Sequence, residues 1–422
     1  MRRDLVRLRG ILQRTVAIKA VAATQSPGGG PAKDGNEPDR PHQTGRPARG
    51  FWGPPSHRSR RVRSIERAAT GLIAALLISA HCIAQSPAPA PATPLAAAPA
   101  AAVPPYKPEY KLSIAVGPAY AWGKGADHWA QLIKERTAGR IVVKQFPGAS
   151  AVGGDVAREF VALRDGTIDL AVGSAINWAT QVKALNVFAL PFLIPDSSAL
   201  DAIIRGDAGK TLFRTIEEAG VVPLAWGDHE LHELSTSQRA VKKPEDVAGL
   251  RMRIIGSPLI EETFRALGAM PARLKWSDAQ NALLGGTADG QETAAQSFIA
   301  TKAHTLNQKH LTCWAMAAEP LIFAVSRAAW DGWTPADRDV VRQAAIDAAK
   351  RETELSRGAT QSAIAALGRE YKEAGVEVIR LTPEARAAFA RAARSVYDKW
   401  ASEIGAEMVK QAEAAVSTSQ KP

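Results

Sequence analysis

The feature of this sequence that most constrains its fold is a regular alternation of strand patterns and helix patterns. Apolar residues alternate with polar or small residues over 110–116 and end at a Gly-Pro pair, which predicts a strand. The segments that follow are a helix at 126–133, a strand at 141–146, a helix at 156–163 and a strand at 168–172. Strands and helices that alternate at this spacing favour an α/β fold with a mostly parallel sheet and helices on both faces.

A second α/β region extends from about residue 227 to residue 319. Around it we expect strands at 221–226, 231–235, 250–255 and 321–325, and helices at 259–267 and 277–284. Two long amphipathic helices then begin at Thr334-Pro335 and Thr382-Pro383, because a threonine N-cap followed by proline favours a helix start. We expect the second of them to continue to about residue 414.

These elements predict two lobes with a ligand cleft between them, since open α/β sheets bind ligands at the carboxyl ends of their strands. The first lobe is expected to comprise 106–226 plus about 320–360, and the second 227–319 plus about 361–415. Residues 416–422 are expected to form a tail.

The N-terminal quarter differs in composition from the body. Residues 1–59 are rich in Arg, Gly and Pro without periodicity, which predicts a disordered extension or a translation start that lies further on, near Val62. Residues 60–84 join a basic segment to a short apolar run, the pattern of a signal peptide cleaved before Gln85. The Ala/Pro-rich segment 85–105 is expected to be an extended linker. We therefore expect the mature protein in the periplasm.

The charge of the chain is concentrated in this same N-terminal region. The formal net charge is +11, and residues 1–84 hold 15 basic against 5 acidic residues, which leaves 38 basic and 37 acidic residues for the rest. A nucleic-acid partner is not expected, because phosphate binding needs an excess of cations in the folded part. Once Cys82 is removed by processing, Cys313 is left alone, which excludes an intramolecular disulfide and a cysteine metal cluster.

None of the polar motifs predicts catalysis. The string from His229 to Glu233 lacks the His-Glu-x-x-His spacing, and on a strand His229 and His232 are expected to face opposite sides. The glycine-rich loop 148–154 has no phosphate-binding motif, and Gly173-Ser174 is not part of a nucleophile elbow. Cys313 lies in an apolar run. We expect neither enzyme activity nor a cofactor or metal, and a secreted α/β hydrolase or lyase is the alternative.

One strand carries a candidate for ligand binding. Leu250, Met252 and Ile254 share one face of the strand, and Arg251 and Arg253 share the other. An arginine that faces a cleft can hold a carboxylate through two parallel hydrogen bonds. Spacing alone, however, favours a surface arginine.

Seven sequence blocks, in order and at regular intervals, carry a family resemblance. They are Gly-Arg-Ile to Phe-Pro-Gly (139–148), Gly-Thr-Ile-Asp-Leu (166–170), Leu-Pro-Phe-Leu (190–193), Lys-Pro-Glu-Asp-Val-Ala-Gly-Leu-Arg-Met-Arg (243–253), Leu-Gly-Ala-Met-Pro (267–271), Trp-Ser (276–277) and Gly-Thr-Ala-Asp-Gly-Gln-Glu (286–292). From about Lys111 to Met408, the chain resembles the solute-binding proteins of tripartite ATP-independent periplasmic (TRAP) transporters, the DctP family.

The resemblance implies a two-lobed fold like that of periplasmic binding proteins, with long C-terminal helices. It also implies a monomeric receptor that closes on an organic acid by a hinge and delivers it to a membrane permease. A sensor kinase in place of the permease is a further alternative. The family arginine that pairs with the ligand carboxylate corresponds to Arg253, which makes this residue the principal candidate.

Two positions depart from the family pattern. His232 stands where the family often has arginine, and Thr293 where it usually has asparagine. Both changes reduce the fixed charge or donor capacity around the carboxylate, which favours a monocarboxylate with an apolar or aromatic remainder over a dicarboxylate. The candidates for the walls around that remainder are Tyr120, Trp122, Asn177, Trp178 and Phe298.

His232 also raises the question of pH dependence. If its ring lies beside the ligand carboxylate, its charge is expected to titrate near the reference pKa of about 6.5, and affinity should then fall as the pH rises. The alternative is a neutral donor or a solvated strand residue, for which affinity does not depend on pH.

Overall fold

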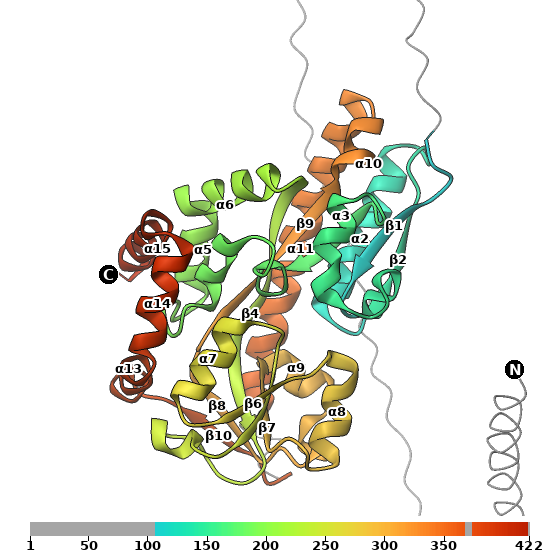
Figure 1. Cartoon of the computed structure of the whole chain (residues 1–422). Helices are drawn as coiled ribbons and strands as arrows, with labels where there is room; N and C mark the ends of the chain where they lie inside the picture. Colours follow the sequence, from blue (N-terminus) through green and yellow to red (C-terminus); the bar gives the residue numbers. More distant parts are fainter. Residues whose placement is uncertain (1–105, 368–373, 421–422) are drawn as a thin grey trace, which may run out of the picture. The chain divides into compact units, whose positions relative to one another are not determined.

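The computed structural model describes residues 106–367 and 374–420 (Figure 1). The expected extension at 1–59, the signal peptide at 60–84 and the linker at 85–105 lie outside the described residues. Within the described part the chain alternates strands and helices, so the expected α/β class is confirmed.

The sheet of the first lobe begins with three parallel strands. β1 (Tyr110–Ile114) lies between β2 (Val143–Phe146) and β3 (Leu170–Ser174). β9 (Ala318–Ser326) pairs antiparallel with β3 and also with β4 (Val221–Thr236). The expectation of a mostly parallel sheet is therefore wrong in its centre. The reason is that β4 leaves the first lobe and β9 returns to it, so these two crossing strands run in opposite directions.

The sheet of the second lobe continues from the far half of β4. β5 (Arg251–Ile254) pairs in parallel with β6 (Met270–Arg273) and β7 (Gly290–Ala294). β7 and β8 (His310–Cys313) pair antiparallel with β4, and β10 (Glu377–Arg380) pairs in parallel with β8. β6, β7, β8 and β10 were not predicted, because these segments of four or five residues show no recognisable alternation of apolar and polar residues.

β4 is a single strand of 16 residues, where the sequence pattern predicts two. Its pairing with β9 shifts register between Asp228 and Leu231, and Glu230 between them has a φ of 75°. An extra residue of this kind is a β-bulge, which bends the strand and resets its alternation. The bulge lies where the chain passes from one lobe to the other.

The helices cover both faces of the sheets (Figure 1). They are α2 (Ala121–Arg136), α3 (Glu159–Arg164), α4 (Ala175–Trp178), α5 (Ser197–Arg205), α6 (Asp207–Glu218), α7 (Pro258–Ala266), α8 (Trp276–Leu284), α9 (Ala295–Ala300), α10 (Arg327–Gly332) and α11 (Pro335–Leu367). α11 contacts α2 of the first lobe and α9 of the second. In the first lobe, Trp129 and Ile133 of α2 share a buried cluster with Val341 and Ala348 of α11.

The expected second long helix is in fact three helices. They are α13 (Pro383–Ala392), α14 (Arg394–Ile404) and α15 (Ala406–Ser419). Thr382 caps α13 as predicted, because its side chain accepts a hydrogen bond from the backbone N–H of Ala385. Gly405 has a φ of 110°, which a helix cannot contain, and this conformation separates α14 from α15. α15 packs on α5 and α6, while α14 contacts α7.

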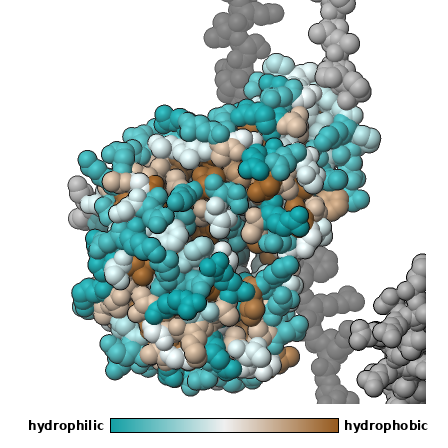
Figure 2. All heavy atoms as spheres, viewed as in Figure 1, coloured by the Kyte–Doolittle hydropathy of each residue, from teal (hydrophilic) through white to brown (hydrophobic). Residues whose placement is uncertain are grey.

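The face drawn in Figure 2 is covered largely by hydrophilic side chains, with hydrophobic residues scattered among them. Within 106–367 and 374–420, no helix has the length and apolar content needed to cross a membrane.

Candidate ligand-binding site

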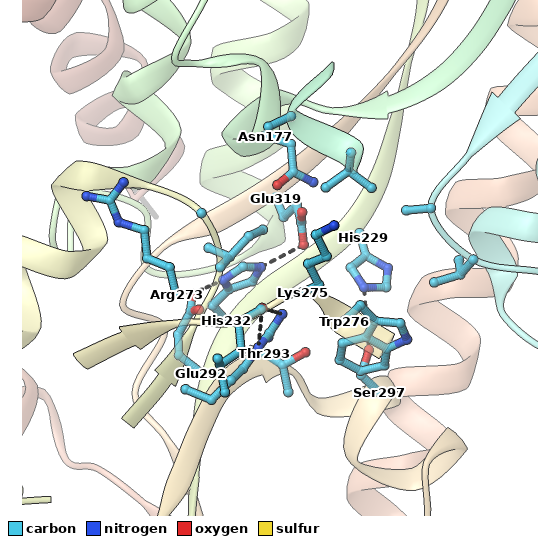
Figure 3. A pocket seen from close by; sticks show the side chains of 18 of the residues that line it. Asn177, His229, His232, Arg273, Lys275, Trp276, Glu292, Thr293, Ser297 and Glu319 are labelled. Atoms are coloured by element: carbon cyan, nitrogen blue, oxygen red, sulfur yellow. Dashed lines mark hydrogen bonds and ion pairs between the residues drawn. The ribbon is translucent and has the colours of Figure 1, made fainter. Parts of the chain in front are cut away.

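A cavity of about 200 Å³ lies between the two lobes (Figure 3). The first lobe contributes side chains from the ends of β1 and β3 and from α2, and the second contributes side chains from β5, β7 and the segment that leads into α8. β4 and β9 supply residues at the crossing. The cavity therefore lies where the resemblance places a ligand, in contact with both lobes.

Arg253 lines this cavity from β5 and is 5% exposed. Its Nε and Nη2 donate to the carbonyl of Leu274 at 3.3 and 3.2 Å, and its guanidinium lies 5.5 Å from the centre of the Trp276 ring. Burial lowers the pKa of Arg253, and Glu292 and Glu319 partly offset that effect. A guanidinium stays charged in proteins, and among the described residues Arg253 forms no ion pair. The cavity thus contains a buried cation that forms no direct ion pair among the described residues, although Glu292 and Glu319 act on it electrostatically.

The bulge in β4 turns both histidines toward the cavity. His229 and His232 both line it, so the expectation that they face opposite sides of a strand is wrong. The physical reason is the extra residue at Glu230, which shifts the alternation of side chains by one position.

His232 is held between two carboxylates. Its Nδ1 is hydrogen-bonded to Glu292 Oε1, and its Nε2 lies 2.8 Å from Glu319 Oε2. Burial alone lowers the pKa of His232, but the two carboxylates outweigh it and raise the pKa to about 10. Burial likewise favours the neutral form of Glu319, whereas the His232 cation and the hydroxyl of Ser174, at 2.5 Å, bring the pKa of Glu319 down to about 2.

The hypothesis of a histidine that titrates beside the ligand is therefore corrected. Both ring nitrogens of His232 already donate to protein carboxylates, which leaves no N–H for a ligand. The ring is an imidazolium at neutral pH, and its charge is compensated within the protein. His232 is paired with two acidic groups beside the cavity and does not take the place of a ligand-binding arginine.

His229 behaves differently. Burial lowers its pKa, so the ring is neutral. Its Nδ1 lies 3.4 Å from the amide nitrogen of Gln296, its Nε2 lies 3.5 Å from the hydroxyl of Ser297, and its ring centre is 5.2 Å from that of Trp122. His229 thus forms a neutral polar part of the wall.

Five of the eight residues expected at the site line the cavity: Trp122, Asn177, His232, Arg253 and Thr293. Trp122 donates its indole N–H to the carbonyl of Val172 at 2.8 Å, which leaves its ring as an apolar wall.

Three expected wall residues do not line the cavity. Trp178 is fully buried and packs edge-on against Phe160, and it follows Asn177 directly. Consecutive helical residues point about 100° apart, so only one of the two faces the cavity. Phe298 is fully buried in a small cluster of the second lobe. Tyr120 lies beside the cavity, with its ring 6.4 Å from that of Trp276.

The structure adds residues that the sequence did not single out. Glu292 and Trp276 lie in the family motifs without an assigned role, and Glu319 and Lys275 were not considered. Lys275 is exposed at the edge of the cavity, whereas Glu292 and Glu319 are buried. Glu292 and Glu319 come next to His232 because β4 pairs with β7 and β9. The linear sequence does not reveal this pairing, so it could not identify the two acids.

The described residues contain no group of three or more His, Cys, Asp or Glu side chains able to hold a metal ion. Burial raises the pKa of the Cys313 thiol to about 12, so this side chain is a thiol at neutral pH and does not line the cavity.

Comparison with known families gives one matching model. It describes a bacterial extracellular solute-binding protein, family 7 (DctP), and matches residues 112–403. The chain is 30% identical to the C4-dicarboxylate-binding periplasmic protein DctP of Rhodobacter capsulatus, over 73% of this chain and 90% of that protein. It is also 30% identical to a protein of Sinorhizobium fredii over 66% of this chain, and there it spans only 50% of the relative's length.

Two solved structures are similar along nearly their whole length. A TRAP periplasmic solute-binding protein from Ralstonia eutropha, with bound (S)-2-hydroxy-2-methyl-3-oxobutanoate ((S)-2-acetolactate), is 50% identical with a TM-score of 0.72, and the match covers 74% of this chain and 100% of that chain. A TRAP periplasmic solute-binding protein from Sulfurospirillum deleyianum, with bound succinate, is 28% identical with a TM-score of 0.67. The match covers 73% of this chain and 98% of that chain. These likenesses confirm the fold class expected from the resemblance.

Proposed function

Because the chain belongs to the bacterial extracellular solute-binding proteins of family 7 (DctP), we propose that it is the periplasmic receptor of a TRAP-type transporter, binding a small organic monocarboxylate and delivering it to the membrane permease. The observation that carries this proposal is the buried guanidinium of Arg253, which faces the cavity without an ion pair among the described residues. A carboxylate that leaves water needs such a charge-assisted partner.

The charge balance of the cavity supports one carboxylate and not two. His232 and Arg253 together carry two positive charges and balance the two negative charges of Glu292 and Glu319. One ligand carboxylate therefore already gives the buried cluster a net negative charge, and a second one would double it. Lys275 also lines the cavity but is exposed, and exposed charges contribute little. A second carboxylate would enter a site that already holds two buried acidic groups.

The ligand of the Ralstonia eutropha protein agrees with this balance, because (S)-2-acetolactate has a single carboxylate and a short branched remainder. The size of the cavity, about 200 Å³, also suits a small acid. Trp122 and Trp276 provide ring surfaces for the remainder of such a ligand.

Ligand capture by hinge closure follows from the position of the cavity. Asn177 and Trp122 reach it from the first lobe, and Arg253 and Thr293 from the second. A ligand that contacts both lobes favours the closed state, whose population it raises. β4 and β9, which connect the lobes, are the strands expected to bend during closure.

The same proposal places the mature chain in the periplasm as a monomer that begins near Gln85. The periplasmic relatives support this location, and so does the signal-peptide pattern at 60–84. Sequencing the N-terminus of periplasmic protein should return a start near Gln85, and a chain that retains Met1 would contradict export by cleavage. Sedimentation of the purified protein should give the mass of one chain.

The proposal is tested by calorimetry with (S)-2-acetolactate and succinate on the wild type and on Arg253→Met. Loss of one member of a buried charge pair costs about 2 to 5 kcal/mol, which is at least about thirtyfold in Kd. We expect the wild type to bind acetolactate more tightly than succinate and Arg253→Met to lose that affinity, with partial recovery in Arg253→Lys. Arg265→Met, which removes an exposed arginine, is the matched control and should bind like the wild type. Unchanged affinity in Arg253→Met would refute the assignment.

A further inference from the structure

Glu292 leaves one carboxylate oxygen unsatisfied at the cavity. Its Oε1 is bonded to His232 Nδ1, whereas its Oε2 is buried and has no hydrogen-bond partner among the described residues. Glu292 lines the cavity and is 1% exposed. Buried polar atoms are nearly always hydrogen-bonded, because leaving one unpaired costs free energy. This oxygen therefore marks a position where a donor is needed.

The charged groups that surround the cavity do not supply this donor. Arg253 directs its Nε and Nη2 to the carbonyl of Leu274, and His232 uses its second nitrogen for Glu319. Glu319 is itself an acceptor, and its other oxygen is bonded to Ser174. Figure 3 shows Glu292, His232 and Glu319 along one side of the cavity. The missing donor has to come from the occupant.

Resting on the proposed function, we propose that Glu292 is a specificity-determining residue which accepts a hydrogen bond from a ligand hydroxyl, and that the ligands are short 2-hydroxy acids. Glu292 and Arg253 both line the same cavity of about 200 Å³, so one small acid can contact both. With its carboxylate at Arg253, an acid that fits about 200 Å³ has its hydroxyl within a carbon or two of that carboxylate. The ligand of the Ralstonia eutropha protein has its hydroxyl on carbon 2.

An ionised carboxylate accepts hydrogen bonds and cannot donate them. An acid with hydrogen or a keto oxygen in place of the hydroxyl leaves Glu292 Oε2 unpaired, and a second carboxylate at that position adds repulsion. Sites built to bind a hydroxyl reject analogues that lack it more strongly than apolar pockets reject an extra methylene. The inference therefore predicts selection against deoxy acids, 2-oxo acids and dicarboxylates.

The wild-type protein provides the first test, which needs no variant. Calorimetry compares (S)-2-acetolactate with its deoxy analogue 2-methyl-3-oxobutanoate, and 2-hydroxyisobutyrate with isobutyrate. A hydrogen bond to a charged group is worth about tenfold to a hundredfold in affinity, and we expect each hydroxy acid to bind more tightly by that factor. Equal affinities within each pair would overturn the role of Glu292.

The second test compares Glu292→Gln with Glu319→Gln. Both changes remove one negative charge beside His232, but both Glu319 oxygens are engaged within the protein, so only Glu292 has an oxygen free for the ligand. We expect the ratio between hydroxy and deoxy acids to fall to within about fivefold in Glu292→Gln, because a neutral acceptor bonds more weakly, and to keep its wild-type value in Glu319→Gln even where affinity changes. An equal loss in both variants would contradict the inference.

Failure of the proposed function gives a different result from failure of this inference. If the wild type binds none of the four acids, or if Arg253→Met does not change its affinity for them, the proposed function is wrong. The proposed role of Glu292 is then wrong as well. If binding is tight and depends on Arg253, but hydroxy and deoxy acids bind with equal affinity, only the role of Glu292 is overturned.

Discussion

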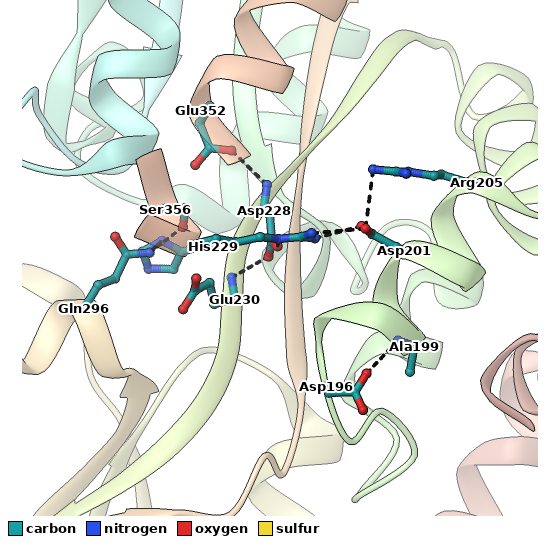
Figure 4. Close-up of polar contacts among 11 residues, drawn as sticks. Asp196, Ala199, Asp201, Arg205, Asp228, His229, Glu230, Gln296, Glu352 and Ser356 are labelled. Carbon is teal, nitrogen blue, oxygen red and sulfur yellow. Dashed lines mark hydrogen bonds and ion pairs between the residues drawn. The ribbon is translucent and has the colours of Figure 1, made fainter. Parts of the chain in front are cut away.

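Two clusters of buried charged residues lie on either side of the β4 bulge, and they differ in how completely they are paired. The cavity cluster consists of His232, Arg253, Glu292 and Glu319. The crossing cluster joins β4 to α5 and α11. It consists of the buried Asp228, Glu230 and Glu352 and the half-buried Asp201 and Arg357, and Figure 4 labels its four acids. Both bury several charges within a few residues of the point where the chain passes between the lobes.

The crossing cluster pairs its arginine, although Glu352 Oε1 has no hydrogen-bond partner among the described residues. Arg357 donates to both oxygens of Asp201 at 3.0 and 2.7 Å and to Asp228 Oδ2 at 2.8 Å. Glu352 Oε2 accepts the backbone N–H of Asp228 at 2.8 Å, and burial raises the pKa of Glu352 well above its ordinary value. Burial also raises the pKa of Glu230 to about 8. Its acids are thus either paired with Arg357 or have raised pKa values.

The cavity cluster, by contrast, keeps a cation and an acceptor unpaired. Arg253 has no ion pair and Glu292 Oε2 has no donor among the described residues. A buried charge costs free energy unless it is paired, so a site that leaves charges unpaired in the folded protein gains affinity when a ligand pairs them. Arg357, which is paired within the fold, thus serves stability, whereas Arg253, which has no ion pair among the described residues, is available for binding.

The largest expected effect that tests this comparison is on stability. Arg357→Met should lower the free energy of unfolding by about 3 kcal/mol, because it leaves Asp228, 1% exposed, as an uncompensated buried charge. Arg253→Met removes an unpaired buried cation and should leave stability unchanged or slightly higher. Denaturant unfolding measures both, and Arg351→Met, at an exposed arginine of α11, is the matched control. An equal loss in Arg253→Met and Arg357→Met would mean that both arginines are structural.

A smaller effect concerns the protonated acids of the crossing cluster. The pKa of Glu230 is raised to about 8 in the folded protein, so the folded state binds this proton more tightly than the unfolded state. Its contribution to stability is present below the unfolded value near pH 4.5 and is lost as the pH rises to about 8. Glutamine carries no such proton. The free energy of unfolding should therefore fall less between pH 5 and 8 in Glu230→Gln, by on the order of 1 kcal/mol.

Unfolding curves at several pH values measure this slope. Glu245→Gln, which changes an exposed glutamate, serves as the control and should retain the wild-type slope. Identical slopes in the wild type and Glu230→Gln would mean that Glu230 is ionised in the folded protein and that the crossing cluster is not neutralised in the way described.

Local patterns predicted many of the elements, and the family resemblance singled out the principal cation. The alternation in 250–254 placed Arg253 on a strand, and the structure finds it at the cavity. The Thr-Pro pairs at 334 and 382 marked helix starts that the structure contains. These features depend on neighbours in the sequence, whose spacing is visible without the fold.

Features that depend on pairing between distant strands were not predictable. The alternation rule assumes an uninterrupted strand, and the bulge at Glu230 breaks it, so no local pattern shows that His229 and His232 share a side. The carboxylates that fix the charge of His232 come from residues 60 and 87 positions away. For the same reason Glu292 was visible as part of a motif but not as an acceptor.

The smallest expected effect is the pH dependence of binding, which separates the two clusters most sharply. His232 has a pKa of about 10 in the described structure, so it stays protonated from pH 5.5 to 8.5 without a ligand. A carboxylic acid ligand is ionised over the same range. Affinity for (S)-2-acetolactate should therefore vary by less than about twofold across this window, even though stability falls with rising pH.

In the variant His232→Gln we expect the opposite behaviour, an affinity that depends on pH. Without the imidazolium, Glu292 and Glu319 lose their compensating charge and repel an anionic ligand at neutral pH. Burial then raises the pKa of Glu319, which the His232 cation no longer lowers, so affinity should rise toward low pH in this variant as Glu319 becomes protonated. Calorimetry at several pH values measures both profiles. A wild-type affinity that falls about tenfold per unit above pH 6.5 would show that His232 titrates beside the ligand, and the cavity cluster would then not be compensated as described.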